Sequence, residues 1–511
     1  MSQTLIKNAT ILTMNKANGS HPFTADILIV GADIARIERN IEPTPETKVI
    51  DATDKLVMPG LINAHIHSSE TFLRGRYQGM PLEVWLLYAY PLLMDDPIGL
   101  RLLHLRSLLL AMESLKAGVT TICDDFFDPP SHDLDRLKTV FGAYETAGIR
   151  ANISSGVLNI HPLDTMPYTR ELVPEHLQAM LDYGPPLKAK DYLDYCNEVF
   201  NTLHGTANGR LQFMLAPSAP QRCTADLYAG CHALAVEQNV PFHTHVLETI
   251  SQAVIGIEKH GKSLIAYMDD LGVLSRHTTI AHSVWVSDAD MSLMGAAECS
   301  VAHNINSNLK LGSGVAPLRR LHDAGVTIGL GTDGISSNDT ASVFDLMRVA
   351  ALIHSAPGPD PKQWLGAEDI LKMATIDGAR TALLDDKTGS LEVGKAADLI
   401  MLDLTSIPFT PLNNIARQLV FAENGSSIEM VMVDGEVVVE KGRMIKFNEF
   451  EILDEIREAM PSYLEAHTKL EGRNAIFEPY FAETHRRAST KDLGMQRYAG
   501  DMTPWTLRNS N

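Results

Sequence analysis

Two histidines separated by one residue, His65 and His67, end an apolar run that starts at Leu61. The Met-Pro-Gly sequence at 58–60 predicts a turn before this run, and the run itself predicts a buried strand. Because side chains alternate along a strand, both imidazoles should project from the same face. Two imidazole nitrogens aimed at one point are suited to binding a metal ion. Taken alone, such a pair is also compatible with two core or solvated histidines.

Three further polar groups also close short hydrophobic runs. His245 and Glu248 follow one run, His282 closes another, and Asp333 follows a third. Residues placed in this way are typical of the C-terminal ends of buried parallel strands. His243 lies two residues before His245, so spacing alone leaves both histidines as possible ligands. The four endings together predict a single site at one rim of a parallel sheet.

The chain between these points predicts a (β/α)8 TIM barrel with its active site where the strands end. Eight apolar segments alternate with amphipathic helical ones. The predicted strands are 61–67, 119–124, 149–155, 211–216, 241–246, 278–282, 299–303 and 326–332. The clearest predicted helices are 98–116, 132–147, 224–238 and 287–297.

The two ends of the chain predict a second architecture beside the barrel, which is expected over 59–387. Short alternating apolar runs separated by turn residues occupy 1–58 and recur in 388–445, so both ends are expected to form one discontinuous β-sandwich. Residues 446–511 are expected to form a helical extension that wraps the body or a neighbouring subunit. Within it, 449–466 predicts one amphipathic helix.

Composition limits the classes of partner. The formal net charge of -20 disfavours binding to nucleic acid, which needs clustered Lys and Arg. The chain has no apolar run near ~20 residues, so no membrane span is expected, and the N-terminus lacks a signal-like segment, so a cytoplasmic location is expected. Five cysteines without CxxC spacing indicate neither a disulfide framework nor a thiolate zinc site. Small molecules are the expected partners.

The ordered motifs resemble those of the amidohydrolase superfamily. The similarity is to the branch that contains S-adenosylhomocysteine and methylthioadenosine deaminases, guanine-type deaminases, and s-triazine hydrolases such as atrazine chlorohydrolase and melamine deaminase. It extends from the N-terminus to about residue 445. The motifs that carry it include VMPGLINAHIH (57–67), HTHVLET (243–249), AHSVW (281–285), GTDGISSND (331–339) and GSLEVGKAADLIMLDL (389–404).

The resemblance implies one divalent metal ion per subunit, held by His65, His67, His245 and Asp333. Three imidazoles and a carboxylate suit Zn²⁺, the expected ion, and also Fe²⁺. Two-metal relatives carry a bridging carboxylated lysine at the end of the fourth strand. This chain reads Met-Leu-Ala-Pro at 214–217 and has no lysine there, which favours a single ion.

The same resemblance implies three catalytic residues. Asp333 would take a proton from the attacking water, and His282 would orient that water. Glu248 would give a proton to a ring nitrogen. General acid and base groups of this kind typically each increase the reaction rate by about 10²- to 10⁴-fold. The alternative for Glu248 is a carboxylate stabilised by a helix N-terminus.

Three residues are candidates for binding the substrate. Trp85 could cover a flat ring or could be a buried helix residue. His303 could line the pocket or could be a hydrogen-bonded core histidine, and Asn308 follows the nucleoside deaminase pattern. Four other histidines in helical stretches are expected to be structural: His104, His232, His260 and His354.

Several positions separate the chain from particular relatives. Lys310 and Gly334 follow the nucleoside deaminases rather than the triazine enzymes. In contrast, Ile305 stands where those deaminases commonly have proline, and the Ser-Ser-Glu sequence at 68–70 stands where they often have apolar residues. These departures argue against both an orthodox S-adenosylhomocysteine substrate and atrazine dechlorination.

The sequence therefore predicts a metal-dependent hydrolase that displaces an amino or other group from an N-heteroaromatic ring such as a purine or an s-triazine. One alternative is a hydrolase of aryl ureas, carbamates or amides, including xenobiotics, because an activated water also attacks a carbonyl. Another is a non-catalytic scaffold, which the full set of ligands disfavours. A homo-oligomer, a dimer or larger, is expected.

Overall fold

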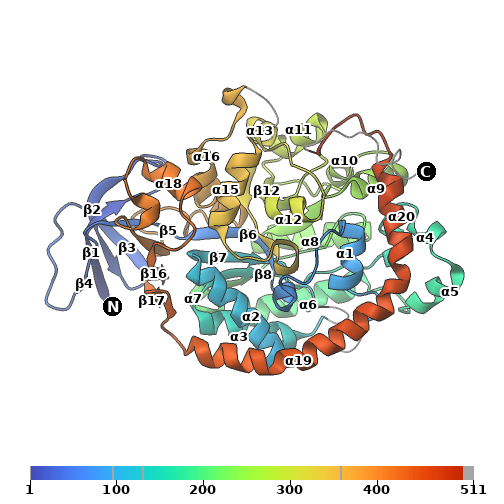
Figure 1. Cartoon of the computed structure of the whole chain (residues 1–511), viewed down its shortest axis with the longest axis horizontal. Coiled ribbons are helices and arrows are strands. Elements are labelled where there is room, and N and C mark those ends of the chain that lie inside the picture. The colour runs from blue at the N-terminus through green and yellow to red at the C-terminus, as the bar shows by residue number, and fades with distance from the viewer. Residues whose placement is uncertain (1, 95–96, 129–131, 357–359, 499–511) are drawn as a thin grey trace.

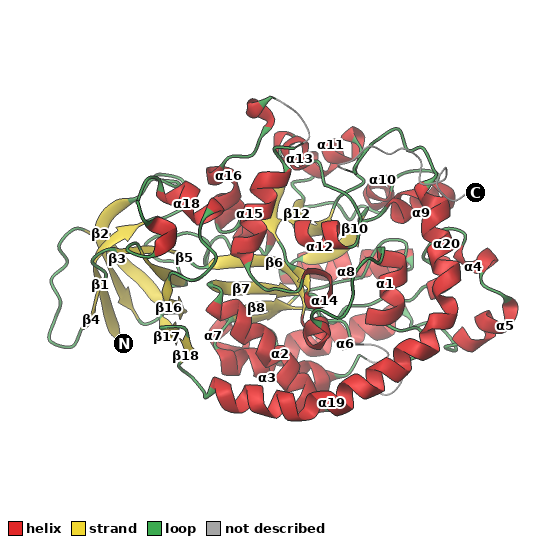
Figure 2. Cartoon of the chain, viewed as in Figure 1, coloured by secondary structure: helices red, strands yellow, loops and turns green. Residues whose placement is uncertain are grey.

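A barrel of parallel strands lies at the centre of the chain, with a β-sheet domain at one end (Figures 1 and 2). The structure is a computed structural model that describes residues 2–94, 97–128, 132–356 and 360–498. The part of the predicted extension from residue 499 onward lies outside these residues. No described helix is long and apolar enough to cross a bilayer.

All eight predicted barrel strands are confirmed, with ends that differ by a few residues. They are β6 (Leu61–His67), β7 (Val119–Asp124), β8 (Arg150–Ile153), β9 (Leu211–Phe213), β10 (Phe242–Val246), β11 (Thr278–His282), β12 (Ser300–His303) and β13 (Thr327–Leu330). A short further strand, β14 (Asp333–Gly334), follows β13.

The strands are hydrogen-bonded in chain order. One parallel sheet runs β14-β6-β7-β8-β9, and the other runs β10-β11-β12-β13. A parallel bridge between Leu215 and Phe242 links the first sheet to the second. At the other side, β14 begins three residues after β13 ends and pairs with β6. This order is that of the (β/α)8 fold class, with β6 adjacent to the strand that carries Asp333.

Helices cover the strands from outside, which is why the strands are buried on both faces and read as apolar runs. The four predicted helices are confirmed as α2 (Leu100–Lys116), α3 (Leu134–Ala147), α8 (Ala225–Gln238) and α11 (Asp288–Ala296). Local sequence sets their ends. The Asp133 side chain accepts hydrogen bonds from the first turn of α3, and Gly148, with a φ of 83°, ends that helix.

The remaining helices connect the strands and form the periphery. They are α1 (Leu82–Ala89), α4 (Thr169–Leu172), α5 (Glu175–Gln178), α6 (Ala189–Thr202), α7 (Thr206–Gly209), α9 (Ile250–His260), α10 (Leu264–Asp270), α12 (Ile305–Lys310), α13 (Leu318–Asp323), α14 (Ile335–Asn338), α15 (Val343–Ile353), α16 (Ala367–Met373), α17 (Ile376–Thr381), α18 (Ile415–Phe421), α19 (Glu449–Asn474) and α20 (Glu478–Ser489).

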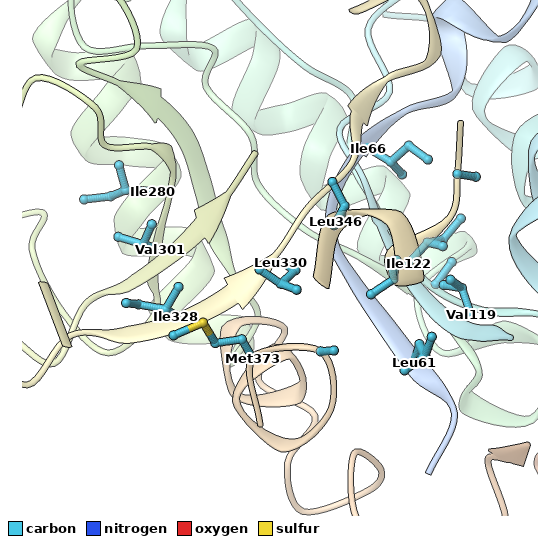
Figure 3. Close-up of a cluster of buried hydrophobic side chains, with 14 of the residues drawn as sticks. Leu61, Ile66, Val119, Ile122, Ile280, Val301, Ile328, Leu330, Leu346 and Met373 are labelled. Atoms are coloured by element: carbon cyan, nitrogen blue, oxygen red, sulfur yellow. The ribbon is translucent and has the colours of Figure 1, made fainter. Parts of the chain in front are cut away.

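Packing between strands and helices makes the barrel a rigid support. Figure 3 shows strand residues such as Ile328 and Leu330 beside Met373 of α16 and Leu346 of α15. These side chains are almost completely buried in the main hydrophobic cluster. Because protein cores are close-packed, they resist displacement of the strand ends that follow them.

The two chain ends, which the alternating patterns predict to form one discontinuous β-sandwich, join their strands in a single hydrogen-bonded sheet. Its strands are β1 (Gln3–Ile11), β2 (Phe23–Val30), β3 (Asp33–Glu38), β4 (Lys48–Asp51), β5 (Lys55–Pro59), β15 (Leu399–Asp403), β16 (Ile428–Val433), β17 (Glu436–Glu440) and β18 (Arg443–Met444). The hydrogen-bond ladder is continuous, and the N-terminal and C-terminal parts meet where Val57 of β5 pairs with Met401 of β15. Side chains from both ends share a separate hydrophobic core.

The C-terminal extension packs on the barrel of the same chain. The predicted helix at 449–466 is confirmed as α19 and continues to Asn474, while α20 lies within the expected helical extension but was not delimited from the sequence. Helix α19 contacts α2, and α20 contacts α1, α4 and α9 (Figure 1). An ion pair between Arg76 and Glu471, with 2.6 Å between Nε and Oε1, fastens α19 to the body.

A buried ion pair joins the barrel to the β-sheet domain and provides a stability test. Arg150 of β8 donates from Nε to Asp398 Oδ2 at 2.6 Å, and both side chains are almost fully buried. Asp398→Ala should lower the free energy of unfolding by about 3–5 kcal/mol, because it leaves a buried guanidinium undercompensated. Urea denaturation measures the change. The matched control Asp194→Ala removes an exposed pair with Lys190 and should cost less than about 1 kcal/mol. Equal, small losses for both variants would contradict the role of the buried pair.

Candidate active site

The structure brings together the four residues that the sequence analysis selects as metal ligands. His67 Nε2 lies 3.3 Å from His245 Nε2. Asp333 Oδ1 lies 3.4 Å from His65 Nε2 and 3.3 Å from His67 Nε2. Tetrahedral zinc with metal–nitrogen distances of about 2.0–2.1 Å separates its ligand atoms by about 3.3 Å. These three separations match that value, and His65, His67 and His245 also form a group that could hold a metal ion.

The second nitrogen of each histidine is held by a partner behind the site. His67 Nδ1 lies 2.7 Å from the carbonyl oxygen of Asp125, and His245 Nδ1 lies 2.9 Å from that of Ser218. His65 Nδ1 lies 2.7 Å from Nε2 of His243. Such partners orient the imidazoles of metal sites. His243, which spacing alone left as a possible ligand, thus lies behind His65.

Burial and charge also favour a cation here. Burial lowers the pKa of His65 to about 4, so its imidazole is neutral, as a metal ligand must be. Its Nε2 atom is buried and has no hydrogen-bond partner among the described residues. Burial alone would raise the pKa of Asp333, but the adjacent imidazoles of His65 and His67 hold that pKa well below its usual range. A carboxylate and an unpartnered imidazole nitrogen in one buried cluster fit a metal ion.

His282 lies beside this cluster and is held from behind. Its Nε2 atom is 3.7 Å from Glu248 Oε2 and 3.8 Å from Asp333 Oδ2. Its Nδ1 atom lies 2.8 Å from Asn308 Oδ1. His282 and Asp333 have φ angles of 75° and 61°, which are unusual for residues other than glycine. Such conformations cost about 1–3 kcal/mol each and concentrate at functional sites.

Glu248 presents a carboxyl group that can carry a proton near neutral pH. The side chain is 3% exposed, and burial raises its pKa to about 7. Among the described residues, its carboxylate makes no hydrogen bond to the N-terminus of α9. The geometry therefore favours an acid facing the cluster over the helix-end carboxylate considered from sequence.

A cavity of about 1010 Å³ opens onto the cluster. His67, His245, Glu248, His282 and Asp333 line it on one side. Much of the remaining wall is apolar and includes Trp85, Leu86, Phe127, Leu158, Met166 and Phe481. The site can therefore hold a largely apolar molecule with its reacting atom at the polar cluster.

The three candidate substrate-binding residues differ in whether they line the cavity. Trp85 of α1 lines the cavity and is also 5% exposed, in contact with Tyr90 at 5.8 Å between ring centroids. Asn308 is fully buried behind His282 and does not line the cavity. His303 is likewise buried away from the cavity, with Nε2 3.1 Å from Nε2 of His354. Only Trp85 is thus in a position to contact a ligand in this cavity.

Glu70 is a cavity residue that the sequence analysis did not select. It is fully buried and accepts hydrogen bonds from Tyr90 Oη at 2.7 Å and from Ser336 Oγ at 2.6 Å. A Cβ atom at Gly334 would lie 1.8 Å from Glu70 Oε2, so any larger residue after Asp333 would require the Glu70 carboxylate to move. The available signal was the unusual Ser-Ser-Glu sequence at 68–70 directly after the His-Ile-His motif.

The sequence profile of the Amidohydrolase family matches residues 56–438, which is most of the chain. The chain belongs to this family. The amidohydrolase is 31% identical over 460 residues to a 5'-deoxyadenosine deaminase from Methanosarcina acetivorans, covering 90% of this chain and 98% of the relative. It is 33% identical over 416 residues to a 5-methylthioadenosine/S-adenosylhomocysteine deaminase from Thermococcus onnurineus, covering 81% and 89%.

Solved structures agree with this family assignment. An atrazine chlorohydrolase from Arthrobacter aurescens, complexed with zinc, superposes on the amidohydrolase with a TM-score of 0.80 at 25% identity, over 90% of this chain and all of the other. An adenosine deaminase from Xanthomonas campestris with bound zinc has a TM-score of 0.79 at 24% identity, over 91% and 99%, and supports the fold. The family resemblance found in the sequence is confirmed.

Removing one imidazole tests the metal centre of the amidohydrolase. His67→Ala should lose bound metal and activity but keep the fold, because His67 lies at a strand end and not in the main hydrophobic cluster. Atomic absorption measures the bound metal, and circular dichroism measures whether the fold is kept. His322→Ala, at a half-exposed histidine, is the control and should retain the ion. Wild-type metal content in His67→Ala would exclude His67 as a ligand.

Proposed function

We propose that this amidohydrolase hydrolytically removes an amino group from an N-heteroaromatic ring, with an adenosine-type purine as the first substrate to test. The observation that carries the proposal is the buried cluster of His65, His67, His245 and Asp333 beside Glu248. The relatives named as 5'-deoxyadenosine and 5-methylthioadenosine/S-adenosylhomocysteine deaminases support the choice of an amino leaving group. The same cluster argues against a non-catalytic scaffold.

His65, His67, His245 and Asp333 would hold one divalent ion per subunit. A bound ion supplies a water molecule activated as a nucleophile near neutral pH. Zinc is favoured because the atrazine chlorohydrolase and the Xanthomonas campestris adenosine deaminase structures contain it, and Fe²⁺ suits the same donor set. A single ion is favoured because no lysine ends the fourth strand at 214–217.

The side chains around the reacting carbon would divide the proton transfers between them. Asp333 takes a proton as water adds to the ring carbon, and Glu248 donates a proton to the adjacent ring nitrogen. His282, held by Asn308, keeps the attacking water oriented. Asp333 would then give its proton to the amino nitrogen, which leaves as ammonia, and the hydroxyl proton would return to Glu248 as the ring carbonyl forms. Trp85 and the apolar wall would exclude other water and cover the flat ring.

Substitution of Glu248 separates the acid from the metal. Glu248→Gln keeps size and hydrogen bonding but cannot donate a carboxylic acid proton, so kcat should fall by roughly 10²-fold or more with metal content unchanged. Ammonia release and metal analysis on the same preparation measure both. The control Glu237→Gln changes an exposed glutamate of α8 and should leave both unchanged. A near-normal kcat in Glu248→Gln would instead favour a leaving group that needs no protonation.

We also propose that the protein is a homo-oligomer, a dimer or larger. Support comes from apolar side chains exposed in or beside the C-terminal extension, namely Ile445 at 51%, Phe450 at 50% and Ile476 at 40%. Light scattering at micromolar concentration should give at least twice the mass of one 56.1 kDa chain. A monodisperse monomer would refute the proposal.

A further inference from the structure

Two arginines line the cavity, and their surroundings differ. Arg136 donates from Nε to Asp128 Oδ2 at 2.5 Å and from Nη1 to the carbonyl oxygen of Ile98 at 2.7 Å. Arg222 donates from Nη1 to the hydroxyl of Ser218 at 3.2 Å, a neutral partner. Among the described residues, no carboxylate forms an ion pair with Arg222. One cavity arginine is therefore neutralised within the protein and the other is not.

The two carboxylates that act electrostatically on Arg222 do not neutralise its charge. Glu83 and Glu248 both act on it electrostatically. Glu83 is already paired with His485, with 2.9 Å between Oε2 and Nδ1, and accepts a hydrogen bond from Thr249 at 3.0 Å. Burial raises the pKa of Glu248 to about 7, so its negative charge is partial near neutral pH. Arg222 itself stays protonated even though burial lowers its pKa.

The position of Arg222 is fixed and close to the reaction site. Its carbonyl oxygen accepts backbone hydrogen bonds from Asn159 and Ile160, both at 3.1 Å, which tie the segment after β9 to the segment after β8. Ser218 connects Arg222 to the metal cluster, since its hydroxyl accepts from Arg222 and its carbonyl holds His245. These contacts hold the backbone of Arg222, and the hydrogen bond to Ser218 directs its guanidinium, so part of the freedom lost on binding a ligand is already lost.

We propose that Arg222 binds an oxyanion of the substrate, a carboxylate or a phosphate. Arg222 is a partly buried cation without an ion-pair partner among the described residues, and an anionic ligand would compensate its charge. The planar guanidinium fork also matches the two oxygens of such a group. The inference rests on the proposed function for the reacting ring and adds a substrate class to it. The substrate is then an aminated N-heteroaromatic compound with a largely apolar body and one acidic group.

Matched substrates test this assignment in the metal-loaded enzyme. Adenosine-5'-carboxylate and its neutral amide, adenosine-5'-carboxamide, differ in charge but scarcely in size, and adenosine 5'-phosphate provides the second acid. Wild-type enzyme should prefer an acid to the amide. Arg222→Gln should lower kcat/KM for that acid by roughly 10- to 100-fold, mainly through KM, as expected for losing a hydrogen bond to a charged group. In the same variant, kcat/KM for the amide should change less than about threefold.

Two further variants separate charge from structure. Arg222→Lys keeps the charge and should retain part of the preference for the acid. Arg136→Gln removes the arginine already paired with Asp128 and should leave the acid-to-amide ratio unchanged. The inference would be overturned if Arg222→Gln lowered kcat/KM equally for the acid and the amide, so that the acid-to-amide ratio of kcat/KM was the same in all variants.

Chemical protection reads binding without turnover. Phenylglyoxal modifies accessible arginines, and peptide mass spectrometry reports the extent at Arg222. We expect the carboxylate or the phosphate, but not the amide, to slow modification at Arg222. Protection by only one of the two acids shows whether Arg222 binds a carboxylate or a phosphate. No protection by either acid contradicts the inference. Protection by an acid in an enzyme that releases no ammonia from any of the three compounds would instead contradict the proposed function and keep the inference.

Discussion

The structure depends on holding one carboxylate and three imidazoles at a single buried point. Asp333 reaches that point because β14 pairs with β6 in parallel, with Asp333 opposite Ile66, between His65 and His67. His245 comes from β10, across the barrel, and its orientation depends on the carbonyl of Ser218. Without a cation, such a cluster would bring desolvated polar atoms together at a cost. The close-packed strands and helices behind the rim keep these side chains in place.

Negative and positive groups lie in different parts of the cavity, the first at the metal cluster and the second where a substrate would bind. The anionic groups near the metal cluster, including Asp333 and the buried Glu70, lie where a divalent ion would balance them. Glu83 is balanced by His485 of the C-terminal helix α20, so the extension also contributes to the electrostatics of the site. Arg222 is left as the positive group facing a substrate. The apolar wall that includes Trp85 and Phe481 would then favour the body of that substrate.

The barrel strands could be predicted because each depends on local sequence, whereas the family resemblance supplied the full set of four proposed ligands and selected His245 over His243. An apolar run that ends in His65 and His67 predicts both a strand and its rim. Other features depend on contacts between distant residues. Asn308 holds His282 across 26 positions, and His303 meets His354 across 51, so neither could be distinguished from a cavity residue by pattern. Helix α20 has few apolar residues of its own and packs through tertiary contacts that its sequence does not reveal.

The most direct test of this account is zinc titration of the metal-free protein. Protein stripped by chelation and dialysis is given increasing zinc, and ammonia release from 5'-deoxyadenosine and related aminopurines is followed together with bound zinc. We expect no ammonia release without metal and a linear rise that saturates at one ion per chain. Full ammonia release from the metal-free protein, or saturation only at two ions per chain, would contradict it.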